Sequence, residues 1–463
     1  VLWSVLAGMF ASGFTITIFV VVLDDVAADL GSTRTTLTWV VTAPTLVVAM
    51  TMALFGKLGD LRGHRRIFLM GLWGYGAVAV LSALAWDAGS LIAFRALGGL
   101  GFAAVVPTGS ALVLGVHRPE DRARVLGLWS LVSAGAPLLG IVLGGPLVDA
   151  VGWRWIFLAQ APMCLIASVA CGRGLRETPG SPHTPIDLAG TAMLMTGAGL
   201  TLLALNRGGP WGWSTSPVVG LFGAGAVAFM LFAMVERRAT HPLVPPQFFR
   251  LRNFSVPITV YALANFSYLG AFFLSPGLLK ATFDMSNTGA SQVMFWRPLV
   301  FSVSAPIAGR LAGRVGARPT AMVGAAAITT SMLVFVAGAN MEALPLVVAA
   351  LVLSGFGLGV MMPPITVLVA NAVGDEHLGV ASGAFQMLGQ LGGTVGLQVL
   401  ASVQDSSPGQ DGYASAFTVG AAVATLATVA TCFLRSEARS GPVSAGPVAG
   451  QLPGVFDAGE PVA

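Results

Sequence analysis

The sequence predicts an all-α, polytopic membrane protein of about fourteen transmembrane helices, arranged as two pseudo-symmetric six-helix bundles with two helices inserted between them. Hydrophobic residues make up 55% and charged residues only 10% of the 463-residue chain, whereas soluble domains carry about 25% charged residues. The mean hydropathy is +0.81. Apolar runs long enough to cross a bilayer, about 18 residues or more, recur along the chain. Each is expected to be helical, because a bilayer offers no water to satisfy backbone polar groups.

In chain order, the first six apolar runs form the N-terminal bundle, residues 1–172. They lie near residues 2–23, 37–57, 67–86, 90–115, 126–148 and 154–172. A polar stretch with three prolines, residues 173–186, follows the sixth run. Two further apolar runs, near residues 187–206 and 217–235, are the inserted helices, and with their connectors they occupy residues 173–253.

The last six runs form the C-terminal bundle, residues 254–439. They lie near residues 254–279, 289–311, 318–338, 343–370, 378–402 and 413–434. Residues 440–463 are rich in Gly, Pro and Ala without periodicity, which predicts a disordered tail. The first helix is expected to be an internal signal-anchor, because no charged region followed by a cleavage site precedes it.

An internal repeat supports the division into two halves. Residues 56–66, GKLGDLRGHRR, are predicted as a charged, Gly-rich turn between two apolar runs, and residues 309–318 are a weaker copy. The copies are offset by 253 residues (316 minus 63), and in each an Arg falls two positions after the second Gly. The matching positions are Gly56, Gly63 and Arg65, and Gly309, Gly316 and Arg318. Such repeats are typical of secondary transporters, whose related halves enclose a site near the bilayer midplane.

The basic residues predict the orientation of the chain. With residues 56–66 placed in the cytoplasm, 18 of the 24 Lys and Arg residues fall on that side, in agreement with the positive-inside rule. Both termini are then cytoplasmic, in a cell membrane that we expect to be a bacterial plasma membrane. The net charge of +4 implies no nucleic-acid partner, because juxtamembrane arginines that meet anionic lipid headgroups account for it.

Three further motifs accompany the repeat. Residues 91–104, LIAFRALGGLGFAA, place Arg95 inside the fourth predicted helix, and residues 152–157, GWRWIF, open the sixth. Residues 136–145, APLLGIVLGG, lie on the fifth predicted helix. The kink and packing positions of this last motif are Pro137, Gly140, Gly144 and Gly145.

Together with the turn, these motifs resemble those of the major facilitator superfamily, and in particular of its fourteen-helix drug:proton antiporter branch of multidrug exporters. The resemblance covers essentially the whole chain. It implies a gating loop at residues 56–66, a membrane-embedded cation at Arg95 and an exporter motif on the fifth helix. The chain departs from the branch in the first helix, where Thr15 and Thr17 stand in place of the usual acid and Thr, so the usual proton-coupling residue is missing.

The turn and its copy are the predicted gate. Glycines permit a tight turn and a close approach of helices, and Asp60 lies where it can meet a basic residue or a helix N-terminus when the cytoplasmic side closes. The alternative is a basic loop that only sets topology. The predicted gating residues are Gly56, Asp60, Gly63, Arg65, Arg66, Gly309, Gly316 and Arg318.

Two arginines inside predicted helices are candidate substrate or coupling residues. A guanidinium at a helix centre costs about 2.5 kcal/mol or more, which favours a partner or a wet cavity around Arg95 and Arg297. The alternatives are a structural polar clamp at Arg95 and, for Arg297 in the outer third of its span, snorkelling to the surface. Three amides either line the cavity or join helices. They are Asn265, Gln386 and Gln390.

No acid lies at the centre of a predicted helix, so proton coupling is expected to use Asp24 and Asp25 at the outer end of the first helix, Asp60, or a group on the substrate. An adjacent carboxylate pair can have one raised pKa, because like charges in a partly dry site resist double ionisation. The alternative is an ordinary solvated start of a loop.

The predicted function is secondary export of small amphipathic molecules, drugs or secondary metabolites, driven by protons through alternating access. Two alternatives stay open, a transporter of an anionic metabolite that uses Arg95 and Arg297, and a membrane sensor or assembly partner that transports nothing. An enzyme is not expected, because the five histidines lie in predicted loops and no metal cluster or nucleophile with a base is evident. No cofactor or metal is implied, and the expected partners are the substrate, protons and the bilayer around a monomer.

Overall fold

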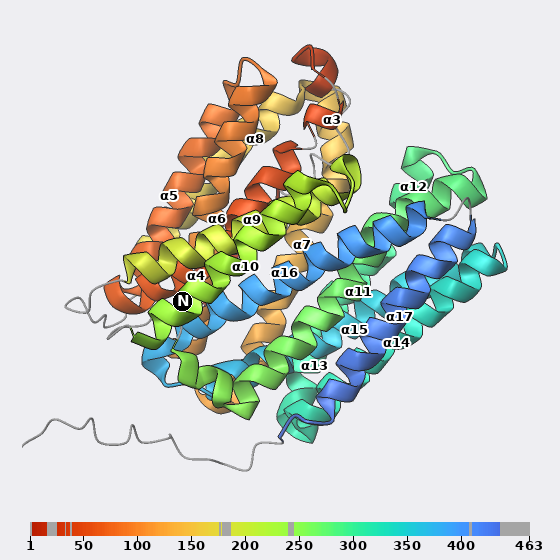
Figure 1. The fold of residues 1–463 in the computed structure, drawn as a ribbon. Coiled ribbons are helices and arrows are strands. Elements are labelled where there is room, and N and C mark those ends of the chain that lie inside the picture. The colour runs from red at the N-terminus through yellow and green to blue at the C-terminus, as the bar shows by residue number, and fades with distance from the viewer. Residues whose placement is uncertain are drawn as a thin grey trace, which may run out of the picture.

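The structure, a computed structural model, describes residues 2–15, 26–32, 34–37, 39–175, 177, 187–238, 245–406 and 410–435. These residues form helices and short connections, with no strand among them. Long helices of the N-terminal and C-terminal parts gather into two groups that lie side by side, and α9 and α10 lie alongside the junction (Figure 1).

The N-terminal part contains seven of the described helices. They are α1 (Leu2–Gly13), α3 (Arg34–Leu37), α4 (Trp39–Arg62), α5 (His64–Ala83), α6 (Ala88–Val116), α7 (Pro119–Val151) and α8 (Trp153–Gly174). The inserted pair and the turn that follows it are α9 (Leu188–Trp211), α10 (Ser216–Arg238) and η1 (Pro246–Arg250).

The C-terminal part follows η1. Its elements are α11 (Arg252–Phe283), α12 (Asn287–Met294), α13 (Trp296–Val315), α14 (Ala317–Asn340), α15 (Leu344–Asn371), η2 (Asp375–His377), α16 (Leu378–Asp405) and α17 (Gln410–Thr431).

The chain is a multi-pass membrane protein. Ten of the described helices are long and apolar enough to cross a bilayer. The helices α7 and α16, with 33 and 28 residues, are also long enough to span but are not among those ten. The expected total of fourteen spans therefore stays a prediction, as do the division at residues 172, 253 and 439 and the tail at 440–463, which lies outside the described residues.

The predicted gating turn is almost entirely helical, which corrects the sequence-based expectation. Helix α4 continues to Arg62 and α5 begins at His64, so Gly63 is the one residue between them, with φ 95°. The second copy has the same form, because Gly316 with φ 99° separates α13 from α14. A positive φ is accessible to Gly without strain. Both helix pairs therefore reverse direction at a single glycine.

The predicted span at residues 289–311 is also corrected. It is divided at Phe295 into α12 and α13, so Arg297, expected in the outer third of one continuous span, is the second residue of α13. Next to α13 lie α15 and α7, and Gly355 of α15 meets the backbone of Arg297.

The two largest apolar clusters are centred one in each part, and each includes residues of the other part. One cluster joins residues of α1, α4 to α8 with a few from α13, α15 and α16, and a larger one fills the space among α11 to α17. Leu194 of α9 belongs to the larger cluster, and α9 contacts both α4 and α16. The inserted pair therefore touches both parts of the molecule along the side where α4 meets α16.

Candidate functional site

The two parts approach each other closely where α4 crosses α16. A Cβ atom on Gly56 would overlap the carbonyl oxygen of Gly379, and one on Gly383 would lie 2.7 Å from the carbonyl oxygen of Met52. Both positions are therefore restricted to glycine by backbone contact. We call this crossing, defined by Gly56, Gly379 and Gly383, the α4–α16 seam.

Asp60 closes one end of the α4–α16 seam. Its Oδ1 accepts a hydrogen bond from the backbone N–H of Gly379 and its Oδ2 accepts one from Val380, both at 2.8 Å. Gly379 and Val380 belong to the first turn of α16, where amides lack helical partners and the helix dipole favours a negative charge. A carboxylate of the N-terminal part thus caps a helix of the C-terminal part, one of the two contacts that the sequence predicted for Asp60.

Two buried basic side chains surround Asp60. His64 Nε2 lies 3.1 Å from Asp60 Oδ1, and Lys57, only 6% exposed, is within electrostatic reach of Asp60 and of Glu236 on α10. His64 was expected in a loop, but it is the first residue of α5 and is buried. The seam therefore holds a carboxylate between titratable basic groups.

A second polar contact joins the parts at the same end of the helices. The Arg122 guanidinium, near the start of α7, donates to Asn371 Oδ1 at 2.8 Å and to Asp375 Oδ1 at 2.9 Å. Sequence reasoning used Arg122 only for topology and missed its partners. They lie about 250 residues further along the chain, so no local pattern connects them to Arg122.

Helices α7 and α13 cross at a glycine that the sequence motif did not indicate. A Cβ atom on Gly127 would lie 2.8 Å from the carbonyl oxygen of Ala305 and the Cα of Pro306. Pro137 and Gly140 lie further along α7, and Gly13 of α1 packs beside Pro137. Gly144 and Gly145 lie in α7, in a stretch whose side chains are not described, so the predicted kink stays a prediction.

Polar side chains continue along the seam toward the middle of the molecule. Ser110 Oγ of α6 hydrogen-bonds Ser382 Oγ of α16. Gln386 and Gln390 follow Ser382 at intervals of four residues, so all three share one face of α16. Both glutamines are half-buried. They therefore lie one and two turns deeper than the serine pair on the face that meets the N-terminal part.

The remaining predicted gating residues do not gather at the seam. The Arg65 guanidinium donates to the carbonyl of Gly172 at 2.7 Å and its backbone N–H donates to Glu177, so it ties α5 to the end of α8. Arg66 is exposed. Gly316 and Arg318 lie at the corner between α13 and α14, and Gly309 lies within α13 about two turns before it.

Arg95 is buried between α6 and α4. Its Nε donates to the carbonyl of Val40 at 3.4 Å, and its guanidinium carbon lies 5.7 Å from the centre of the Phe157 ring. Only 6% of the residue is exposed. Arg95 is therefore buried, as expected, and lies in the interior of the N-terminal part.

Arg297 is fully buried in the C-terminal part. Its guanidinium stacks on the Tyr268 ring at 3.6 Å and its Nη2 donates to the carbonyl of Tyr268. Snorkelling is therefore excluded in this conformation. Asn265, one turn before Tyr268 on α11, is also buried and hydrogen-bonds Tyr261, whose ring stacks on Phe385.

The coupling candidates are only partly within the described residues. Thr15, at the position where the antiporter branch has an acid, donates to Gln160 Oε1 at 3.0 Å. Asp24 and Asp25 lie outside the described residues. Of the three predicted acids, the structure thus places Asp60 alone.

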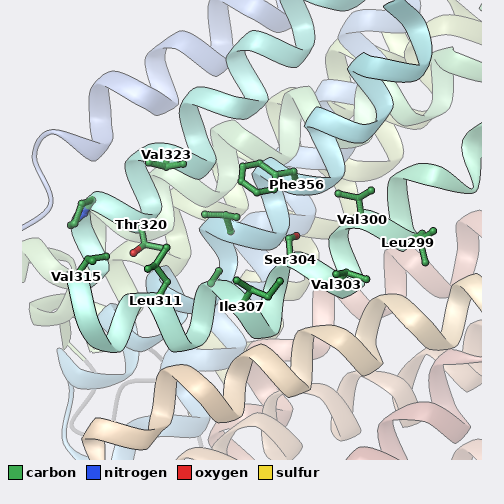
Figure 2. A pocket seen from close by; sticks show the side chains of 13 residues that line it. Leu299, Val300, Val303, Ser304, Ile307, Leu311, Val315, Thr320, Val323 and Phe356 are labelled. Atoms are coloured by element: carbon green, nitrogen blue, oxygen red, sulfur yellow. The ribbon is translucent and has the colours of Figure 1, made fainter. Parts of the chain in front are cut away.

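An apolar groove of about 490 Å³ lies between α13, α14 and α15 (Figure 2). Its walls include Val303, Ile307 and Val323, which are more than half exposed on the outside of the bundle. In a membrane protein this surface faces lipid. The groove carries no titratable side chain, so the polar seam is the better candidate site.

The family model described as Major Facilitator Superfamily matches residues 5–397, and a second match covers residues 257–454. The chain belongs to the Major Facilitator Superfamily. This family of transporters points to transport rather than catalysis as the activity of the chain.

Curated relatives in the superfamily cover most of the chain. The puromycin resistance protein pur8 of Streptomyces alboniger is 30% identical over 84% of this chain and 78% of its own length. The multidrug transporter protein MdtP of Bacillus subtilis is 27% identical over 88% of this chain and 75% of its own. The tetracenomycin C resistance and export protein of Streptomyces glaucescens is 29% identical over 98% of this chain and 84% of its own length.

A solved structure confirms the superfamily fold. The human organic anion transporter MFSD10 matches with a TM-score of 0.71, covering 93% of this chain and 98% of its own, at 18% identity. At this identity the likeness concerns the fold alone.

Proposed function

We propose that this protein is a secondary active exporter of small amphipathic molecules that works by alternating access. The observation that carries the proposal is the cap that Asp60 places on α16. This contact joins the two parts at one end only, and it must break for a central site to open toward that end. The bare glycine surfaces at Gly56 and Gly379 are suited to separating and meeting again.

The relatives support export as the direction and amphipathic compounds as the substrate class. Those named above are designated for puromycin resistance, multidrug transport and tetracenomycin C export. We accordingly propose a bacterial plasma membrane location with both termini cytoplasmic, since the arginine-rich ends of α4, α5 and α10 then face the cytoplasm. On this orientation the Asp60 contact closes the cytoplasmic side.

Protons are the proposed driving ion, as the resemblance to the fourteen-helix drug:proton antiporters implies. Coupling would use Asp24, Asp25 or Asp60, or a group on the substrate, since Thr15 replaces the usual acid of the first helix. We expect the double change Asp24→Asn with Asp25→Asn to diminish a weak proton dependence. The measurement is flux driven by an imposed pH gradient in proteoliposomes, with the exposed pair Asp121→Asn and Asp411→Asn as a charge-matched double control. Full pH-driven flux in the double variant would move the assignment to Asp60 or to the substrate.

The deciding experiment is transport by the purified full chain in proteoliposomes. A fluorescent cationic dye and a fluorescent organic anion are offered in parallel, with and without the pH gradient. We expect gradient-dependent movement of an amphipathic dye. Movement of neither compound under any gradient would refute the proposal and favour a membrane sensor or assembly partner.

The second candidate is a transporter of an anionic metabolite that uses Arg95 and Arg297. The observation that favours it is the burial of both guanidinium groups, one in each part of the molecule. Transport of the organic anion alone in the same assay would support this candidate over drug export.

A further inference from the structure

Arg297 lies deep in the C-terminal part rather than near its edge. Its ring partner Tyr268 is at the middle of the 32-residue helix α11. On its other side, Gly355 near the middle of α15 touches the Arg297 backbone so closely that a Cβ atom there would collide with the carbonyl oxygen. The backbone is thus fixed against α15 while the side chain points toward α11.

The guanidinium is left short of acceptors within the described part of the chain. Nη2 donates to the Tyr268 carbonyl, but Nε and Nη1 are buried and have no hydrogen-bond partner there. Arg297 lies on α13 and contacts residues of α11 and α15, and these three helices contain no Asp or Glu. A buried cation without an anion is strongly unfavourable. The missing acceptor therefore has to come from outside these helices.

The side chains around Arg297 indicate what kind of molecule supplies the missing acceptor. Tyr268 and Phe272 place aromatic rings 3.6 and 5.1 Å from the guanidinium carbon. Aromatic walls favour a flat ring, and the unpartnered N–H groups favour an anionic oxygen. Lipid is not the source, because the lipid-facing side of α13 carries Val303 and Ile307, whereas Arg297 is fully buried.

We propose that Arg297 binds the anionic oxygen, carboxylate or phenolate, of an aromatic amphipathic substrate. This deepens the proposed export function and rests on it for the route by which the ligand arrives. Helix α13 carries both Arg297 and the contact of Ala305 and Pro306 with Gly127 of α7. A shift of α13 against α11 within the C-terminal part, coupled to movement at this contact, opens the site.

The test is ligand-dependent thermal stability of the purified full chain in detergent. The probes are 1-naphthoate and its neutral counterpart 1-naphthamide, each in gluconate and in chloride buffer. The variants are Arg297→Met, Arg297→Lys and Lys280→Gln, the last removing an exposed cation from the end of α11. Naphthoate, but not naphthamide, is expected to raise the Tm of the wild type and of Lys280→Gln.

The two changes at Arg297 separate ligand binding from a structural clamp. Without ligand, Arg297→Met is expected to melt at a higher temperature than the wild type, because an uncompensated buried charge is removed, and its Tm should not respond to naphthoate. Arg297→Lys should respond with an apparent affinity weakened roughly ten-fold, since Lys lacks the planar fork. An Arg297→Met protein that melts below the wild type would identify a clamp and overturn the proposal.

Two further outcomes would also overturn it. One is an equal naphthoate response in wild type and Arg297→Met, and the other is stabilisation by chloride with none by naphthoate, which would assign the site to an inorganic anion. Export is measured separately in proteoliposomes. Dye export without Arg297-dependent binding would overturn this site alone, whereas Arg297-dependent binding without any export would overturn the proposed function alone.

Discussion

At the scale of single residues, a side-chain carboxylate of one part binds backbone amides of the other at the α4–α16 seam. Asp60 accepts two amide hydrogen bonds from the first turn of α16, an arrangement that needs two acceptor oxygens and a negative charge. His64 and Lys57 hold that carboxylate in place from the N-terminal side. One side chain thus links the two parts, and its removal tests whether the link matters.

Asp60→Asn is expected to lower the initial rate of export by about ten-fold or more. The amide group turns one acceptor into a donor that faces an N–H group, and the loss of a charge-assisted hydrogen bond costs about 1.5 to 3 kcal/mol. This shifts the balance between closed and open forms. Export per folded molecule in proteoliposomes is the measurement, with exposed Asp121→Asn as control. Equal rates in wild type and Asp60→Asn would remove Asp60 from the gate.

A second residue-scale prediction concerns acid stability at the opposite end of α8. Asp29 accepts hydrogen bonds from Arg154 and Trp153, and the Arg154 guanidinium holds the pKa of this carboxyl below its usual value of 3.8. Because the folded-state pKa is lowered, the ion pair stabilises the fold at neutral pH and its contribution disappears as the pH falls below about 4. Both side chains are partly exposed, so the contribution is at most about 1 kcal/mol.

Asp29→Asn should therefore flatten the fall in Tm between about pH 5 and pH 3, and Arg154→Gln should flatten it equally. Thermal unfolding in detergent across this range is the measurement. Parallel curves for the wild type and both variants would show that the pair contributes nothing to acid sensitivity.

At the scale of elements, the sequence correctly located the repeated glycines but not the helical structure of the residues around them. Gly63 and Gly316 were recognised by their spacing, and both are the single non-helical residues at equivalent corners. Their neighbours were wrongly predicted as loop, because charged helix ends lower the hydropathy and shorten the apparent spans. Asp60 was expected to meet a helix N-terminus or a basic residue, but that helix could not be named, since Gly379 lies 319 residues away.

The glycines at the α4–α16 and α7–α13 crossings also show that a sequence does not reveal which remote helix a residue contacts. Gly56 stood out because it belongs to a repeated motif, whereas Gly127 and Gly379 carry no local pattern and acquire their role only when remote helices pack. On α7 the sequence motif predicted packing at Gly140, Gly144 and Gly145 and did not identify Gly127. A single sequence reveals periodicity within a helix but not which distant helix packs against it.

Gly56→Ala is expected to abolish export while the protein still inserts and folds. The new methyl group would overlap the Gly379 carbonyl, so α4 and α16 cannot reach their closest packing and the closed form is disfavoured. Gly74→Ala on α5 is the matched control, because a Cβ atom there meets nothing within 4 Å. Export and Tm are measured for both, and full export by Gly56→Ala would show that the tight crossing is dispensable.

At the scale of the whole molecule, the polar contacts between the parts, as far as the chain is described, concentrate at one end. Asp60 with α16, Arg122 with Asn371 and Asp375, and the serine pair all lie where α4, α6 and α7 meet α15 and α16. A molecule held together at one end can open at the other, and opening the closed end requires these contacts to break together. Alternating access therefore predicts that a covalent bond across this end stops the cycle.

Ser110→Cys with Ser382→Cys tests this requirement. The two hydroxyl oxygens are in hydrogen-bond contact, so paired thiols are expected to form a disulfide on mild oxidation. Exposed Cys432 is replaced by Ser to avoid competing bonds, and Cys164 and Cys171 are buried. Oxidation should abolish export and a reductant should restore it, while either single cysteine variant stays insensitive. Export that continues at the full rate in the cross-linked protein would mean that the α6–α16 contact does not separate during transport, and the rocking of two parts would have to be abandoned.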